Sequence, residues 1–218
     1  MPTEEQLPSN VIRFPADRRA SPQSSLPGID GDQIRHEREV TVLLAEIRDW
    51  PAVSEKLGDA QARVTLSRAI DGALAAFGEH GADGITLDGD PSQPTISCEF
   101  DGDDGPIRAL RAAVAARRAI ADSQAPAPPE NQFRLGVGLD TGEMMHVKAD
   151  DQLSYQAVGA MRMVATRLRD FAGPGQVFLT REVYEEAGGL AQVQPLGEVR
   201  INVHGETKEA FSLTALME

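Results

Sequence analysis

Residues 133–143 read Phe-Arg-Leu-Gly-Val-Gly-Leu-Asp-Thr-Gly-Glu. The apolar side chains from Phe133 to Leu139 predict a buried strand, and Thr141-Gly142 predicts a turn after it. A second strand is expected near residues 144–147, as the partner of the first. This segment therefore predicts one hairpin of a sheet.

Working outward from this segment, strand and helix patterns alternate along the chain. Residues 40–47 form a near-continuous apolar run, which is typical of a central strand buried on both faces. The other expected elements are a helix over 54–79 with Ser54 as its N-cap, a hairpin of strands 85–87 and 95–100, a helix over 106–123, a helix over 158–171, a strand over 177–179 with a short helix from Thr180, and a closing hairpin of 199–203 with 210–215. This order predicts an α+β fold with a ferredoxin-like βαββαβ core and C-terminal additions.

The beginning of the chain has a different composition from the rest. Residues 1–36 carry five prolines, many serines and no sustained apolar periodicity. Such a composition buries too little apolar surface to offset the entropy of ordering. We therefore expect a disordered tail over 1–36 and one folded domain over 37–218.

Net charge and cysteine content exclude several classes of protein. The chain of 218 residues has 34 acidic and 21 basic side chains, a net charge of −13. Nucleic-acid binding requires a basic face, so no nucleic-acid partner is expected. Cys98 is the only cysteine, which excludes an internal disulfide and a multi-cysteine metal site. No apolar run approaches the ~20 residues that span a bilayer, and no signal-peptide pattern is present, so we expect a cytoplasmic protein without membrane contact.

Three blocks together resemble the catalytic domain of class III nucleotidyl cyclases, and the similarity runs over about residues 38–216. The second block is the segment 133–143, which resembles the family's Leu-Gly-Ile-Gly-Ile-His-Thr-Gly-Glu. The other two are residues 38–50, Arg-Glu-Val-Thr-Val-Leu-Leu-Ala-Glu-Ile-Arg-Asp-Trp, and residues 155–167, Tyr-Gln-Ala-Val-Gly-Ala-Met-Arg-Met-Val-Ala-Thr-Arg, with Gly173-Pro-Gly-Gln-Val-Phe-Leu-Thr180 after it. The resemblance implies the cyclase fold.

The resemblance also implies a reaction, in which the ribose 3′-oxygen of a nucleoside triphosphate attacks the α-phosphate and pyrophosphate leaves. Two Mg²⁺ ions held by two aspartates assist it. Glu46 stands at the first metal position. The alternative to a metal-binding role is that Glu46 is a charged residue at a strand end that faces solvent. Asp88 or Asp90 stands at the second, in a hairpin whose Pro91 and Pro94 predict a rebuilt, solvated turn in place of a tight one. These three residues are therefore candidates for a vestigial metal site.

The remaining catalytic positions have changed residue type. Thr86 and Ser154 stand where the family has the lysine and aspartate that select the base. Met163 stands at the family's ribose-binding asparagine, and its alternative role is packing. Arg167, four residues further on, is the one retained position, although a lone arginine on a helix is usually a solvated charge.

These substitutions favour a catalytically degenerate cyclase-like domain that acts as a dimerising or regulatory signalling module. Seven acidic residues and no lysine or arginine lie between Gly81 and Ile107, which disfavours a triphosphate there. Two alternatives stay open: an active nucleotidyl cyclase of altered specificity, and the metal-bearing half of a heterodimeric cyclase. No cofactor is expected, with Mg²⁺ or Mn²⁺ required only if the domain is active. The expected partner is a second copy or another cyclase domain.

Overall fold

The computed structural model describes residues 34–125, 127–149, 152–154, 161–201 and 205–217. Their strands form one sheet in the order β2-β3-β1-β4-β6-β8-β7, with β5 paired to β4. The elements are β1 (Ile34–Arg48), α1 (Trp50–Leu57), α2 (Asp59–Glu79), β2 (Asp83–Asp90), β3 (Gln93–Asp101), α3 (Gly105–Ser123), η2 (Pro129–Asn131), β4 (Arg134–Ala149), β5 (Gln152–Ser154), α4 (Met161–Phe171), β6 (Val177–Thr180), α5 (Arg181–Glu186), β7 (Ala191–Arg200) and β8 (Thr207–Leu216). The predicted α+β class and βαββαβ core are confirmed.

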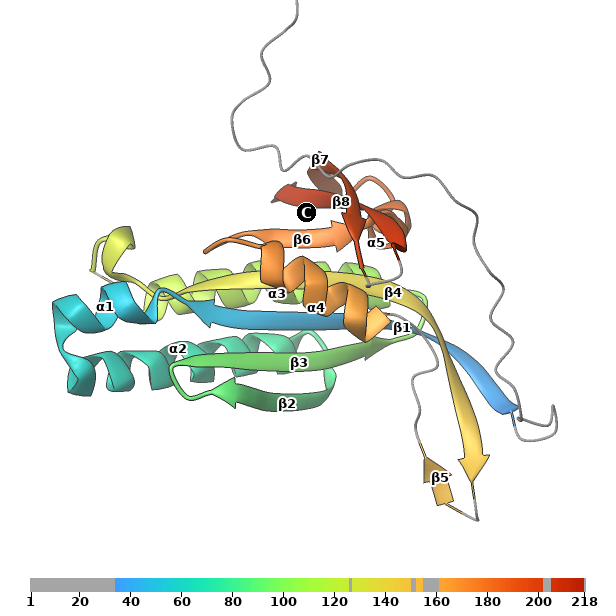
Figure 1. Cartoon of the computed structure of the whole chain (residues 1–218), viewed down its shortest axis with the longest axis horizontal. Helices are drawn as coiled ribbons and strands as arrows, with labels where there is room; N and C mark the ends of the chain where they lie inside the picture. The colour runs from blue at the N-terminus through green and yellow to red at the C-terminus, as the bar shows by residue number, and fades with distance from the viewer. Residues whose placement is uncertain (1–33, 126, 150–151, 155–160, 202–204, 218) are drawn as a thin grey trace, which may run out of the picture.

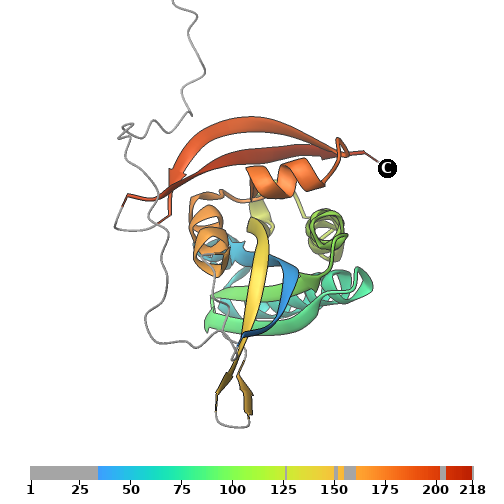
Figure 2. The same cartoon turned by 90° about the vertical axis from the view of Figure 1, so that its right-hand side faces the viewer.

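Helices cover both faces of the sheet around β1. α2 and α3 lie on one face and α4 lies on the other (Figures 1 and 2). Alternate β1 residues supply the two faces: Leu43, Ala45 and Ile47 pack in the core under α2 and α3, whereas Val42 and Leu44 join Met161 and other residues of α4. The near-continuous apolar run in β1 therefore reflects burial on both sides.

The predicted helix over 54–79 is two helices. α1 begins at Trp50, after Asp49, which has a positive φ of 78°. Gly58, with φ 77°, separates α1 from α2. Ser54 lies inside α1 and its hydroxyl donates to the carbonyl of Pro51 at 3.2 Å, so its assignment as an N-cap was wrong. A positive φ suits glycine, which explains the break at Gly58.

The predicted turn at Thr141-Gly142 was also wrong, because β4 continues to Ala149. Thr141 is buried and lies 3.0 Å, between hydroxyl oxygens, from Thr41 of β1. Gly142 pairs with Val40 in the same ladder. The hydroxyl of Thr41 gives the buried Thr141 a hydrogen-bond partner, so this polar sequence can continue as a strand. The strand that forms a hairpin with β4 is β5, and residues 144–147 belong to β4 itself.

The hairpin between β2 and β3 is tighter than its prolines predicted. β2 extends to Asp90 and β3 begins at Gln93, so only Pro91 and Ser92 form the turn. Pro94 lies within β3, opposite Gly89. The expectation that the prolines exclude a tight turn was therefore wrong, although the tip is exposed to solvent as expected.

The domain boundaries are partly outside the described residues. Of the predicted tail, residues 1–33 lie outside them, and residues 34–36 belong to β1. The expected helix over 158–171 is described from Met161 onward. The helix over 106–123, the strand at 177–179 and the short helix after Thr180 are confirmed as α3, β6 and α5. The closing hairpin is present as β7–β8, but the position predicted for its first strand, 199–203, was wrong: β7 spans Ala191–Arg200, and residues 202 and 203 lie outside the described residues.

Candidate functional site

The candidate carboxylates lie near one row of paired residues across the sheet. Asp88 of β2 is paired with Thr95 of β3, and Thr95 is paired with Glu46 of β1. Residues in register on neighbouring strands share a face, so Asp88 and Glu46 both belong to the face that carries α4. Two strand spacings separate their backbones by about 10 Å.

Glu46 is already neutralised by two arginines. Its Oε1 lies 2.9 Å from Nη1 of Arg48, and its Oε2 lies 3.5 Å from Nε of Arg169, on α4. The Glu46 side chain is 14% exposed, so these guanidinium groups contact a carboxylate with little access to water. A metal ion at this position would have to displace both.

Asp88 and Asp90 have local partners on the hairpin. The Thr86 hydroxyl donates to Oδ2 of Asp88 at 3.3 Å. The amide and hydroxyl of Ser92 donate to Oδ1 of Asp90 at 2.7 and 2.5 Å, which holds the pKa of Asp90 below its usual value. Asp90 therefore closes the turn. Within the described ranges, no group of three or more His, Cys, Asp or Glu residues is placed to hold a metal ion.

The two candidate base-selecting residues lie far apart in the sheet. Thr86 belongs to the edge strand β2, whereas Ser154 belongs to β5, opposite Val147 of β4. Strands β3, β1 and β4 separate β2 from β5. Within one protomer these two residues do not form a common binding surface.

The outer face of α4 carries both of its candidate residues. Met163 is 43% exposed and Arg167 is exposed, and Phe171 continues the same helical face at 37% exposure. Met161, by contrast, is buried against β1. The packing role considered for Met163 is therefore filled by Met161, and Met163 lies at the surface.

The sequence interpretation missed Arg48 and Arg169. Both stand beside residues that were singled out, since Arg48 is two positions after Glu46 on the same strand face and Arg169 is two after Arg167. The alternation of side chains along β1 was the available signal for Arg48. Nothing in the sequence places Arg169 against β1, because that contact depends on how α4 crosses the sheet.

A second buried ionic group also escaped the sequence interpretation. Oδ1 of Asp140, on β4, accepts from the Thr180 hydroxyl at 2.7 Å and from Lys208 of β8 at 3.2 Å. Burial raises the pKa of Asp140 despite the positive charge of Lys208. Burial alone would lower the pKa of Lys208, but Asp140 and Glu182 outweigh it and raise that pKa. This group ties β4, β6, β8 and α5 together.

Solved structures show which fold this is. The chain aligns with the guanylyl cyclase Cya2 at TM-score 0.65 and 20% identity, over 84% of this chain and 95% of that one. It aligns with the adenylyl cyclase CyaB from P. aeruginosa at TM-score 0.64 and 16% identity, over 83% and 95%. The dimeric guanylyl cyclase domain of the RhoGC fusion protein from the aquatic fungus Blastocladiella emersonii gives TM-score 0.63 and 16% identity, over 84% and 99%.

The chain has the fold of a class III nucleotidyl cyclase catalytic domain. At these identities the likeness is one of fold. No protein-family model matches the chain, and no curated protein matches it. Among the described helices of this cyclase-fold domain, none has the length and apolar character needed to cross a membrane.

The cyclase fold implies a divalent metal, and the residues of this domain do not fit one. Mg²⁺ needs carboxylate oxygens that are open to it in octahedral geometry. Both oxygens of Glu46 face guanidinium groups, and Asp90 is engaged by Ser92. The candidate carboxylates of this domain therefore do not fit a divalent metal ion.

Proposed function

We propose that this chain is a catalytically inactive cyclase-fold domain that acts in signalling by associating with a second copy of itself. The observation that carries the proposal is that each candidate metal carboxylate is already bonded within its own protomer. Glu46 is paired with Arg48 and Arg169, and Asp90 closes its own turn. Among the residues that the structure describes, no set of carboxylates is placed to hold the metal ions of a two-metal reaction.

The surface chemistry of α4 supports the same proposal. Met163 presents a thioether, a weak acceptor that cannot donate a hydrogen bond to a ribose oxygen. Arg167 is exposed at the retained position, but groups that act as one catalytic unit lose activity together when a member is missing. Retention of Arg167 alone therefore does not supply catalysis.

A second copy is the partner that the charges on this sheet face fit best. α4 carries exposed Arg162 and Arg167 beside the apolar side chains of Met163 and Phe171. β2, at the sheet edge, carries exposed Asp83, Asp88 and Asp90. A basic, partly apolar helix and an acidic strand on one face are complementary to the same face of a second copy turned by a two-fold axis.

A four-nucleotide assay tests the absence of catalysis. The purified domain, incubated with ATP, GTP, CTP or UTP and either Mg²⁺ or Mn²⁺, is expected to form no cyclic nucleotide. Cyclic product from the pure protein would overturn the proposal in favour of an active cyclase of altered specificity. Product that appears only after addition of a second, complete cyclase domain would favour the heterodimeric half-site.

Sedimentation of the full chain tests self-association. We expect a monomer–dimer equilibrium, and a strict monomer at all concentrations would contradict the proposal. The proposal also includes a cytoplasmic location and no nucleic-acid partner. The cytoplasmic location is supported by the single cysteine, and the absence of a nucleic-acid partner is supported by the net charge of −13.

A further inference from the structure

Three strongly interacting side chains meet where β1 ends beneath α4. Arg48 and Glu46 come from β1, and Arg169 comes from the last turns of α4. Besides its contact with Glu46, Arg169 donates through Nη1 to the hydroxyl of Thr95 on β3 at 3.1 Å and through Nη2 to Asp170 at 2.5 Å. We call Glu46, Arg48 and Arg169 the arginine clasp.

The clasp is charge-balanced and largely shielded from water. The side chains of Glu46, Arg169 and Arg48 are 14%, 16% and 22% exposed. Asp170, whose side chain is 42% exposed, supplies a second negative charge at the edge of the clasp, so two guanidinium groups meet two carboxylates. A shielded carboxylate requires a counter-charge, and arginine supplies one that is permanent and delocalised.

The clasp also holds backbone from α4. Nη2 of Arg48 donates to the carbonyl oxygen of Arg169 at 2.7 Å, in the last turn of α4, where the same oxygen also accepts from the Ala172 amide at 3.1 Å. A cation at this end also interacts favourably with the helix dipole. On β4, Gly136 leaves the space for Arg48, since a Cβ there would lie 2.9 Å from Nε of Arg48.

We infer that Arg169 supplies beside Glu46 the positive charge that a divalent cation would supply in the cyclase fold, and that the resulting clasp fixes α4 on β1 and β3. The inference rests on the proposed function, because a working metal site would contradict it. It goes further by assigning Glu46 a new role. Its ionic contact with Arg169 determines the position of α4, and the outer face of α4 is the surface that we propose contacts the second copy.

A double-mutant cycle tests the clasp. Glu46→Gln and Arg169→Gln are each expected to lower the melting temperature of the full chain by about 3–8 °C, and the double variant to lose clearly less than the two losses added. Arg118→Gln, on the exposed surface of α3, is the matched control and is expected to shift the melting temperature by less than about 1 °C. Additive losses would overturn the clasp.

Manganese binding tests the replacement of the metal. The wild type and Glu46→Gln, titrated with Mn²⁺ and followed by electron paramagnetic resonance, are expected to bind the same small amount of ion. Strong binding by the wild type that Glu46→Gln abolishes would overturn the inference. This result is separate from the nucleotide assay, since an inactive domain that binds Mn²⁺ through Glu46 would leave the proposed function standing while the inference fails.

Discussion

Nζ of Lys208 lies 3.2 Å from Oδ1 of Asp140, whose side chain is 1% exposed. This contact joins β8 to β4 across β6, and Lys208 is the positive group that contacts this buried carboxylate. Removal of one partner from a buried ion pair leaves the other charge without compensation. Lys208→Met should therefore reduce the free energy of unfolding by about 3 kcal/mol at pH 7, measured by urea denaturation.

Removal of the other partner should reduce the free energy of unfolding much less. Asp140→Asn removes the buried charge, and it leaves Lys208 paired with Glu182 at 3.1 Å. The double variant Asp140→Asn with Lys208→Met should recover part of the loss of Lys208→Met alone. Since burial raises the folded-state pKa of Asp140, its ionisation makes the wild type less stable relative to Asp140→Asn as pH rises from about 4. This account would be contradicted if the difference in free energy of unfolding between the wild type and Asp140→Asn stayed constant as pH rises from about 4.

The backbone of α4 passes directly over Gly138 of β4. A Cβ at this position would overlap the carbonyl oxygen of Ala165 and the amide nitrogen of Arg169, which are helix backbone. Gly138→Ala should therefore displace α4 and destabilise the chain by about 3 kcal/mol or more. Gly78→Ala is the control, because a Cβ there meets nothing within 4 Å; it should stabilise by about 0.5 kcal/mol. Thermal and urea unfolding of both variants test the comparison.

The Asp90–Ser92 contact should be visible in a carboxyl titration. Two hydrogen bonds from Ser92 favour the ionised form of Asp90 and lower its pKa. Ser92→Ala removes the hydroxyl and should move the Asp90 pKa upward toward its usual value, as followed by carbon-13 NMR. The stability that this contact contributes is present above the unfolded pKa of about 3.9 and is lost as pH falls through the lower folded value. An Asp90 pKa unchanged by Ser92→Ala would exclude the contact.

The order of elements could be predicted from the sequence because it depends on local patterns. The apolar run of 40–47 and the helix pattern of 106–123 each specify their own structure, and β1 and α3 match them. The break at Gly58 and the continuation of β4 through Thr141 could not be predicted in this way. The first is a backbone conformation available to glycine, and the second depends on a hydroxyl partner, Thr41, that is distant in sequence.

The part of the candidate site that could be predicted is the part that depends on the alternation of side chains along a strand. The pairing of Asp88, Thr95 and Glu46 in one row follows from register, which the exact ends of the hairpin determine. The neutralisation of Glu46 by Arg169 depends on the packing of a helix across the sheet, which no local pattern encodes. The sequence therefore identified the carboxylate and missed its counter-charge.

A charge exchange tests the geometry proposed for the dimer. In a two-fold assembly each contact occurs twice, so a single substitution changes two contacts. Arg167→Glu and Asp88→Arg should each weaken self-association by roughly tenfold or more, measured by analytical ultracentrifugation at moderate salt.

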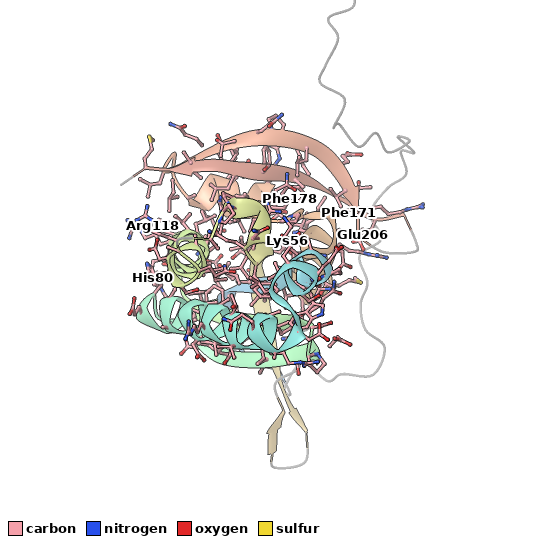
Figure 3. The ribbon with its side chains drawn as sticks, turned by 90° about the vertical axis from the view of Figure 1, so that its left-hand side faces the viewer. Lys56, His80, Arg118, Phe171, Phe178 and Glu206 are labelled. Carbon is pink, nitrogen blue, oxygen red and sulfur yellow. The ribbon has the colours of Figure 1, made fainter. Side chains whose placement is uncertain are left out.

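The variant that carries both changes should recover most of the affinity, because each opposite charge meets its complement again across the axis. Arg118→Glu is the control: Figure 3 shows Arg118, on α3, and Phe171, at the end of α4, on opposite sides of the molecule. This control should associate as the wild type does, since it changes the net charge equally without touching the α4 face. Self-association that is equally weakened by Arg118→Glu, or that the exchanged pair does not restore, would mean that net charge and not this face determines the dimer.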